Sequence, residues 1–362
     1  MKKPIIFSFF SGSGFLDLGF EHSGFDVQFV NEYYEPFLKA YQYSRKKMGI
    51  DEPKHGYFLG DIRNISSHEK LSFSDKVEDA KNCGLLGFIG GPPCPDFSVG
   101  GKNKGEHGDN GVLTRAYVET IMEFLPHFFV FENVKGLWRT KKHREFYERM
   151  KETLSTEYNL TDRLTNSIEY GAPQDRDRIF LFGIRKEIDS ENIEFPWDSH
   201  IKYDREKVLT KSIWPSTDGS ENESLTYENW QKDITVSHWF IKNKVETHPN
   251  SKHHFIPRSG LAKFMTIKEG DVSKKSYKRL HRYRYSPTAA YGNNEVHVHP
   301  YLARRISASE AMAIQSLPQE FELPENMSLT DMFKTIGNGV PYLAAKGLAE
   351  TVLDYLEKLD KR

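Results

Sequence analysis

The chain has 362 residues and a formal net charge of −1, and 38% of its residues are hydrophobic. This length allows one large domain or two of ordinary size, with a core that needs neither disulfides nor metal ions. No apolar run approaches the ~20 residues of a membrane span, which argues against a membrane protein. The net charge selects neither nucleic acid nor membrane as a partner, since such surfaces depend on local patches of charge. We expect no metal site.

Short apolar runs alternate with amphipathic stretches up to about residue 185, which is typical of a doubly wound, mostly parallel α/β sheet. Buried strands are expected at 5–10, 27–30, 85–89, 128–131 and 179–184, and a helix at 114–125, ended by Pro126. From Arg185 to about Tyr291 the sequence is polar and lacks a sustained period, which predicts a second domain of irregular structure. Periodicity then returns in a helix at 309–315, capped by Ser307 or Ser309, and in another at 343–359.

The two cysteines, Cys83 and Cys94, differ in their surroundings. Such a low count favours reduced thiols over a disulfide framework. Cys83, in KNCGLL, is expected at the edge of the core. Cys94 lies between two prolines in GGPPCPDFSVGG, where a small apolar core residue would not be expected.

Polar residues follow several expected strands at the point where each ends. In an open α/β sheet, ligands bind beyond the carboxyl ends of the strands. The first strand leads into SGSG, a turn whose glycines let the backbone approach a ligand. Glu32 ends the second strand, 20 residues after Gly12, at about the spacing that lets a carboxylate reach a ribose hydroxyl. Asp61, the GGPPC turn and Glu132 follow later strands.

The first turn favours a nucleoside ligand without phosphates. It lacks the complete GxGxxG fingerprint, and Phe15 and Leu16 stand where a phosphate-binding loop would carry Lys and Ser or Thr. The common nucleoside ligand of this kind is S-adenosyl-L-methionine.

Six segments resemble, in order, the motifs of the C5-cytosine DNA methyltransferase family. They are FSFFSGSGFLDLGF, GGPPCPDFS, FENV, QDRDRIF, RRISASEAMAIQSLPQEF and IGNGVP. The resemblance runs from Phe7 to about Leu348, with a gap at about 186–291 where the family carries its variable target-recognition region. Two residues depart from the motifs: Phe15 stands where a glycine often closes the first motif, and Pro95 where glutamine is more frequent.

The resemblance implies a Rossmann-like, S-adenosylmethionine-dependent methyltransferase fold. Residues 1–188 and 328–362 would form the catalytic and cofactor-binding domain, and 189–327 a smaller target-recognition domain. The implied function is site-specific methylation of cytosine in duplex DNA, with the target base flipped out of the helix. The chain would then be the modification enzyme of a bacterial restriction–modification system, a cytoplasmic monomer at the nucleoid, with a partner endonuclease acting on the same site.

The resemblance also assigns catalytic roles to Cys94, Glu132, Arg176 and Arg178. Carbon 5 of cytosine is a poor nucleophile, and addition of the Cys94 thiolate to C6 would make it nucleophilic. Because a free thiol is mostly protonated at neutral pH, Cys94 needs help from N–H groups or cations. Glu132 would bind the N3 edge and exocyclic amine of the base, and Arg178 would hold its O2 and orient Glu132, with Arg176 supporting the site.

The cofactor residues implied by the motifs surround the first turn. Phe10 and Tyr33 would contact the adenine, Glu32 the ribose and Asp61 the adenine amine. Gly12 and Gly14 would admit the methionine part. Pro92, Asn338 and Val340 would complete the pocket, which requires the end of the chain to fold back onto the first domain.

Two segments are candidates for DNA contact. The first, 97–111, contains five glycines, and its place after Cys94 favours a lid over a plain surface loop. The second, SKKSYKRLHRYRY, interleaves cations with tyrosines, although a solvated basic face is the alternative. The candidate DNA-binding residues are Ser98, Lys274, Lys275, Lys278, Arg279, Arg282 and Arg284.

Two other functions stay open on the sequence alone. One branch of the family modifies cytosine in tRNA, but it largely lacks the recognition region, whereas about a hundred residues separate QDRDRIF from RRIS here. A catalytically silent DNA-binding homologue is the other alternative, with Phe15 and Pro95 as the suspect positions.

Overall fold

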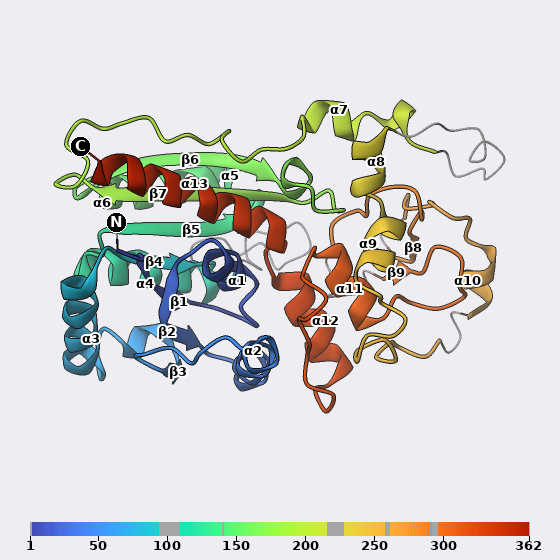
Figure 1. Ribbon diagram of the computed structural model, residues 1–362, viewed down its shortest axis with the longest axis horizontal. Coiled ribbons are helices and arrows are strands. Elements are labelled where there is room, and N and C mark those ends of the chain that lie inside the picture. The colour runs from blue at the N-terminus through green and yellow to red at the C-terminus, as the bar shows by residue number, and fades with distance from the viewer. Residues whose placement is uncertain are drawn as a thin grey trace.

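The computed structural model describes residues 2–93, 109–139, 141–215, 228–257, 261–274, 276–289, 291 and 296–361. These residues form two lobes, one built on a central sheet and the other on short helices (Figure 1). Most of the expected lid and the surroundings of Cys94 lie outside the described residues. Within the described ranges, no helix combines the length and apolar character needed to cross a membrane.

The sheet has seven strands in the order β3-β2-β1-β4-β5-β7-β6. Their bounds are β1 Ile5–Phe9, β2 Asp26–Glu32, β3 Tyr57–Leu59, β4 Leu86–Gly90, β5 Phe128–Val134, β6 Tyr158–Asn166 and β7 Asp177–Arg185. The first five strands are parallel, and β7 runs antiparallel to both of its neighbours. The expected doubly wound, mostly parallel sheet is therefore confirmed.

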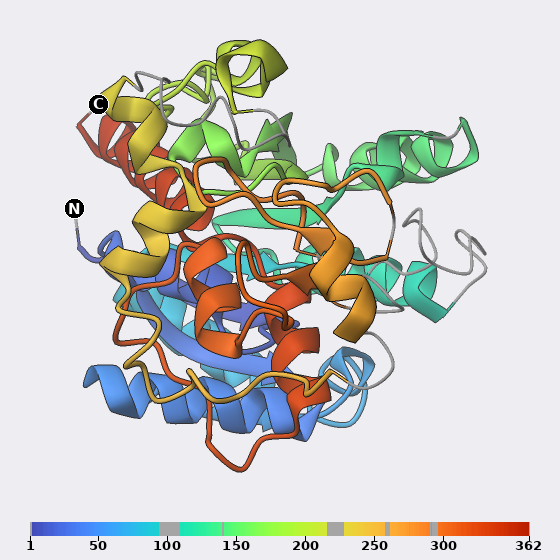
Figure 2. The ribbon, with the colours of Figure 1, turned by 90° about the vertical axis from the view of Figure 1, so that its right-hand side faces the viewer.

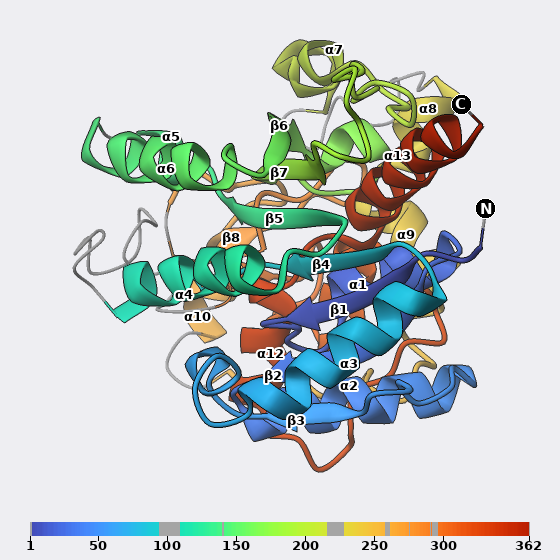
Figure 3. The same ribbon diagram turned by 90° about the vertical axis from the view of Figure 1, so that its left-hand side faces the viewer.

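Helices cover both faces of this sheet (Figure 3). On one face, α3 (Lys70–Cys83), α4 (Asp109–Phe124) and α6 (Lys141–Leu154) pack against strand side chains such as Phe7 and Phe88. On the other face lie α1 (Phe15–His22), α2 (Glu35–Met48) and α13 (Tyr342–Asp360). Cys83 is the last residue of α3 and is exposed, so its expected place at the edge of the core is wrong.

The end of the chain returns to the sheet lobe, as the motif order predicted. Helix α13 packs on α1 so closely that a Cβ on Gly19 would lie 2.6 Å from Ala345. This contact places the residues just before α13 beside the first turn of the sheet.

The second lobe is irregular, as expected. It contains α7 (Arg205–Leu209), α8 (Asn229–Asp233), α9 (Val236–Lys242), α10 (Leu261–Thr266), β8 (Lys278–Arg279), β9 (His297–Val298), α11 (Ala308–Ile314) and α12 (Leu329–Asn338). Ser307 caps α11 in a capping box with Glu310. In Figure 2, where this lobe faces the viewer, α11 and α12 stand in front of the sheet.

The two lobes share apolar contacts. Phe15 and Leu18 of α1 belong to the same buried cluster as residues of α9, α11 and α12. Phe195 packs instead with Phe182 and Tyr355 in the sheet lobe. The domain boundaries at 188 and 328 stay a prediction.

Candidate functional site

A cleft of about 1160 Å³ opens beyond the carboxyl ends of β1, β2, β4 and β5. Residues from the second lobe, among them Lys278, Thr288 and Tyr291, form part of its wall. The expected site residues that line it are Phe10, Gly12, Glu32, Tyr33, Asp61, Pro92, Glu132, Arg176, Arg178, Lys278, Asn338 and Val340. Residues spread over more than three hundred positions thus meet in one place.

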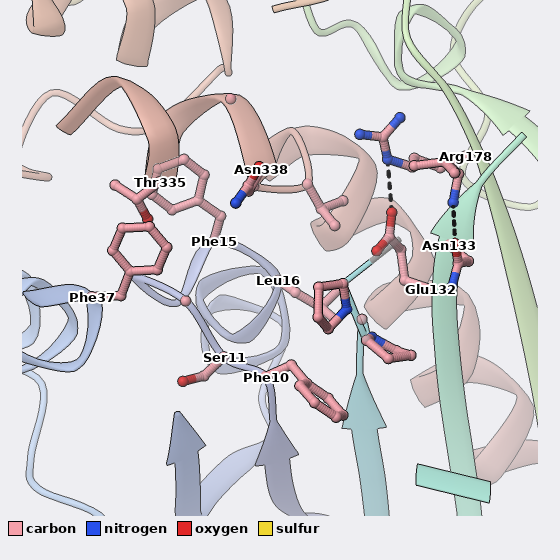
Figure 4. A pocket seen from close by; sticks show the side chains of 18 of the residues that line it. Phe10, Ser11, Phe15, Leu16, Phe37, Glu132, Asn133, Arg178, Thr335 and Asn338 are labelled. Carbon is pink, nitrogen blue, oxygen red and sulfur yellow. Dashed lines mark hydrogen bonds and ion pairs between the residues drawn. The ribbon is translucent and has the colours of Figure 1, made fainter. Parts of the chain in front are cut away.

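Glu132 and Arg178 form the polar centre of one end of the cleft (Figure 4). They come from neighbouring strands, β5 and β7, and Arg178 Nε lies 2.7 Å from Glu132 Oε1. Glu132 is only 8% exposed. Burial raises the pKa of Glu132 above its ordinary value, against the opposing effect of the two arginine charges. Protonated at higher pH than an exposed glutamate, its carboxyl group can donate a hydrogen bond.

Gly91 has no side chain, and the carboxylate of Glu132 lies in the space beside it. A Cβ at position 91 would lie 2.6 Å from Glu132 Oε2, so a larger residue would require the Glu132 carboxylate to move from its place beside Arg178. The second glycine of GGPPC is therefore explained by the carboxylate of another motif.

Arg176 connects two walls of the cleft by hydrogen bonds. Its guanidinium is buried and donates to the carbonyl oxygens of Ala289 at 2.8 Å and Gly337 at 2.7 Å. Ala289 belongs to the second lobe and Gly337 directly precedes Asn338. Burial lowers the pKa of Arg176 well below its ordinary value. Its contacts suit a supporting role, in which it fixes two walls of the cleft.

The other end of the cleft is built around Glu32. Its carboxylate accepts hydrogen bonds from the backbone N–H groups of Gly12 and Tyr34, both at 2.8 Å. Burial raises the pKa of Glu32, although these N–H groups oppose that effect. Each carboxylate oxygen keeps a lone pair that a ligand hydroxyl could use. Ser11 Oγ is buried as well, and none of the described residues forms a hydrogen bond with it.

Two neighbouring residues complete this end. Asp61 accepts hydrogen bonds from the backbone and guanidinium of Arg63, which lower the pKa of Asp61. Tyr33 is 72% exposed and lines the mouth of the cleft. Figure 4 shows Phe10, Ser11 and Asn338 on this side, away from Glu132.

Gly14 is not among the residues that line the cleft. It precedes α1 with a φ of 80°, and a Cβ there would lie 2.5 Å from the ring of Tyr41. Its carbonyl accepts a hydrogen bond from Arg45 Nη2 at 2.7 Å. The position therefore needs glycine because of internal packing and backbone geometry. Its expected contact with the methionine part stays a prediction.

The candidate DNA-binding residues differ in their surroundings. Lys274 is exposed and Lys278 lines the cleft. Arg282 pairs with Glu269 at 2.8 Å, and Arg284 donates to the carbonyl of Pro215 at 3.4 Å. Cys94, Ser98 and Lys275 lie outside the part of the chain that the structure describes.

Arg279 is buried, so its expected role in DNA contact is wrong. It is 5% exposed and donates to the carbonyls of His299, Pro300 and Leu302. Strand β8 turns alternate side chains to opposite faces, which sends Lys278 into the cleft and Arg279 into the lobe.

Sequence patterns did not indicate every residue of the site. Tyr291 lines the cleft, and its buried hydroxyl has no hydrogen-bond partner among the residues that the structure describes. Gln315 donates to the carbonyls of Ile336 and Gly339 on either side of Asn338, and it accepts from Gln174 at 3.0 Å. Both glutamines lie in recognised motifs, which was the available signal, whereas Tyr291 follows a stretch without any period.

Comparison with known proteins identifies the family of this chain. The model of the family described as C-5 cytosine-specific DNA methylase matches residues 5–354. Type II methyltransferase M.NmeDI of Neisseria meningitidis serogroup C is 58% identical over 359 residues, covering 98% of this chain and 85% of that protein. Type II methyltransferase M.FnuDI of Fusobacterium nucleatum is 30% identical over 365 residues, covering 98% and 97%.

Solved structures share the fold. A protein described as a DNA modification methyltransferase encoded within an E. coli prophage has a TM-score of 0.68 at 20% identity, with 98% of this chain and 100% of that chain covered. The S. pombe Dnmt2 methyltransferase has a TM-score of 0.61 at 13% identity, with 99% and 100% covered. Because the family model matches residues 5–354, nearly the whole of this chain, the chain belongs to the C-5 cytosine-specific DNA methylase family.

Proposed function

We propose that this DNA (cytosine-5-)-methyltransferase transfers a methyl group from S-adenosyl-L-methionine to a cytosine that it flips out of duplex DNA at a specific sequence. The proposal rests on one observation: the same cleft contains Glu132 and Arg178 at one end and Glu32 and Asp61 at the other. A base and a nucleoside cofactor bound at these two ends would face each other.

The residues of the Glu32 end fit S-adenosylmethionine. Glu32 would accept hydrogen bonds from the ribose hydroxyls and Asp61 from the adenine amine, and Phe10 and Tyr33 would contact the adenine ring. Gly12 is open enough for the methionine part, because a Cβ there would meet only Thr335 Oγ1, at 4.0 Å. Pro92, Asn338 and Val340 would close the pocket. When bound, this cofactor supplies an activated methyl group on a sulfonium sulfur.

At the other end, Glu132 and Arg178 would hold the cytosine. The Cys94 thiolate would form a bond to C6 while Glu132 donates a proton to N3, which moves electron density to C5. Once C5 carries the methyl group, a base from solvent would remove the C5 proton, which restores the C5–C6 double bond and expels the thiolate, and N3 would return its proton to Glu132. Arg178 would hold O2 and keep Glu132 in place, and Arg176 would keep both walls of the cleft together.

The biological setting is proposed from the relatives. The most similar of those compared above is 58% identical and is named a Type II methyltransferase. We therefore propose that this chain acts as a monomer at the nucleoid, in the bacterial cytoplasm, protecting DNA from a partner endonuclease. The second lobe, with Lys274 and Lys278 facing the DNA, would read the site.

Transfer of a labelled methyl group tests the substrate. Mixed-sequence duplex DNA and bulk tRNA would be offered separately to the intact protein and to Cys94→Ala. Label on DNA alone, lost in the variant, is expected. Label on tRNA alone would contradict the proposal, and label on neither would favour a DNA-binding protein without turnover.

A further inference from the structure

The end of α5 (Gly136–Arg139) and the first turn of α6 carry cations that have no role in the site described above. Residues 135–144 read KGLWRTKKHR, with five Lys or Arg and no Asp or Glu, in a chain whose net charge is −1. Lys135 is neutralised by Asp177 at 2.8 Å. We use the name α5–α6 surface for Arg139, Lys141 and Lys142, all of which are exposed.

These three cations form few ion pairs with the described residues of the protein. Among the described residues, no carboxylate pairs with Arg139 or Lys142, and Lys141 reaches only Glu145, at 3.9 Å. Lys141 is 93% exposed, so that ion pair contributes little to stability. Lys141 and Lys142 also stand in the first turn of α6, where the helix dipole favours acidic residues instead. Stability therefore does not explain this cluster of charge.

The α5–α6 surface adjoins the base-binding end of the cleft. Arg139 lines the cleft and lies seven positions after Glu132, because α5 follows directly on β5. Strand β2, which ends at Glu32, lies three strands from β5 in the sheet. At the usual spacing of about 4.8 Å between neighbouring strands, β2 and β5 are roughly 14 Å apart. Figure 3 shows α5 and α6 projecting beyond the sheet. The surface thus belongs to the base side of the cleft and not to the cofactor side.

We infer that the α5–α6 surface binds phosphates of duplex DNA, on the strand that carries the flipped cytosine. This inference rests on the proposed function. A base that enters the pocket at Glu132 stays attached to its sugar and flanking phosphates, which must pass the mouth of the pocket. Arg139 of the sheet lobe and Lys278 of the second lobe both line the cleft that contains Glu132. The sheet lobe therefore contacts the DNA backbone directly, and the duplex is bound by both lobes.

The test is the salt dependence of DNA binding by Arg139→Gln/Lys141→Gln/Lys142→Gln. Each phosphate contact contributes about 0.9 to the slope of log K against log salt. The slope on mixed-sequence duplex DNA should fall by roughly 2 to 3, equally for any sequence. The matched control neutralises Lys2, Lys358 and Lys361, which are exposed near the two chain ends, far from the second lobe (Figure 1). Its slope should stay as in the unmodified protein.

Further readouts separate this inference from a folding defect and from the proposed function. The variant should unfold at the same or a higher temperature, because it removes charges that oppose the helix dipole, and its KM for S-adenosylmethionine should not change. An unchanged slope alongside normal methyl transfer would overturn the α5–α6 surface alone. If the slope falls in the variant but the unmodified protein transfers no methyl group, the α5–α6 surface still binds phosphates and the proposed function is overturned.

Discussion

Phe15 and Gly339 pack directly against each other, so that a Cβ on Gly339 would lie 2.1 Å from Phe15 Cδ2. Phe15 occupies a position where the family often has glycine, and Gly339 belongs to the IGNGVP turn that holds Asn338. The phenyl ring also packs edge-on against Phe321, with ring centroids 5.1 Å apart. Phe15 is thus accommodated by close packing against the terminal motif.

This packing predicts strong coupling between the two positions. Gly339→Ala should lower stability and raise the KM for S-adenosylmethionine, because the new methyl group displaces Phe15 or the turn beside Asn338. In the background of Phe15→Ala, the same substitution should cost much less. A double-mutant cycle on the free energy of unfolding measures the coupling, expected to lie between about 0.5 and 3 kcal/mol. Simple additivity would contradict the account.

Glu132→Gln tests the protonated carboxyl group. Burial raises the pKa of Glu132, so its acid form persists to higher pH than that of an exposed glutamate. Activity that needs this proton should fall as the pH rises through that pKa. The variant should lose this limb of the pH profile, and its kcat should drop by about 10²-fold. Single-turnover rates at saturating DNA, measured from pH 5.5 to 8.5, would show it, and an unaltered profile would argue against proton donation by Glu132.

Arg279 and Lys278 are adjacent but should respond in opposite ways. Arg279→Gln leaves buried carbonyls without donors and should destabilise the protein by several kcal/mol, at about 1–3 kcal/mol for each unsatisfied group. Lys278→Gln should reduce the salt slope of DNA binding by about 1, and it should cost less stability than Arg279→Gln because Lys278 is only partly buried and lines the cleft. Urea unfolding and binding titrations on both variants check this, and a stable Arg279 variant with weaker DNA binding would restore the sequence-based assignment.

His297 predicts an acid-sensitive second lobe. Both ring nitrogens lack hydrogen-bond partners within the described part of the chain, and burial, followed by the charge of Lys278, lowers the pKa of His297 to about 3. Because the unfolded chain binds the proton near pH 6.5, stability is complete above that pH and is lost as the pH falls toward 3. Between pH 7.5 and 5 this residue should remove about 2 kcal/mol. In His297→Leu that part of the pH dependence should vanish, and equal losses in both proteins by urea unfolding would refute it.

Much of the fold was accessible from the sequence because buried parallel strands are continuous apolar runs, as in Phe128–Val134. The strand Tyr158–Asn166 escaped detection since it pairs on one side only and carries polar residues such as Asn159, Thr161 and Asp162. The carboxylates Glu32, Asp61 and Glu132 were found because they follow strands whose carboxyl ends meet at one edge of the sheet.

Other features depend on contacts that a sequence does not display. The inward direction of Arg279 depends on the register of a two-residue strand, and the role of Gly14 depends on the ring of Tyr41 from another helix. Tyr291 reaches the cleft only because the second lobe folds against the sheet.

The most direct test of Cys94-dependent methylation uses duplex DNA in which 5-fluorocytosine replaces every cytosine. Fluorine at C5 cannot leave as a proton, so the bond between Cys94 and C6 should persist once the methyl group has been transferred. We predict a complex that survives denaturation, requires S-adenosylmethionine and yields the Cys94 peptide joined to the base by mass spectrometry. The adduct should form in Cys83→Ala and be absent in Cys94→Ala. Methyl transfer to ordinary cytosine by Cys94→Ala, or an adduct on any other residue, would contradict the mechanism.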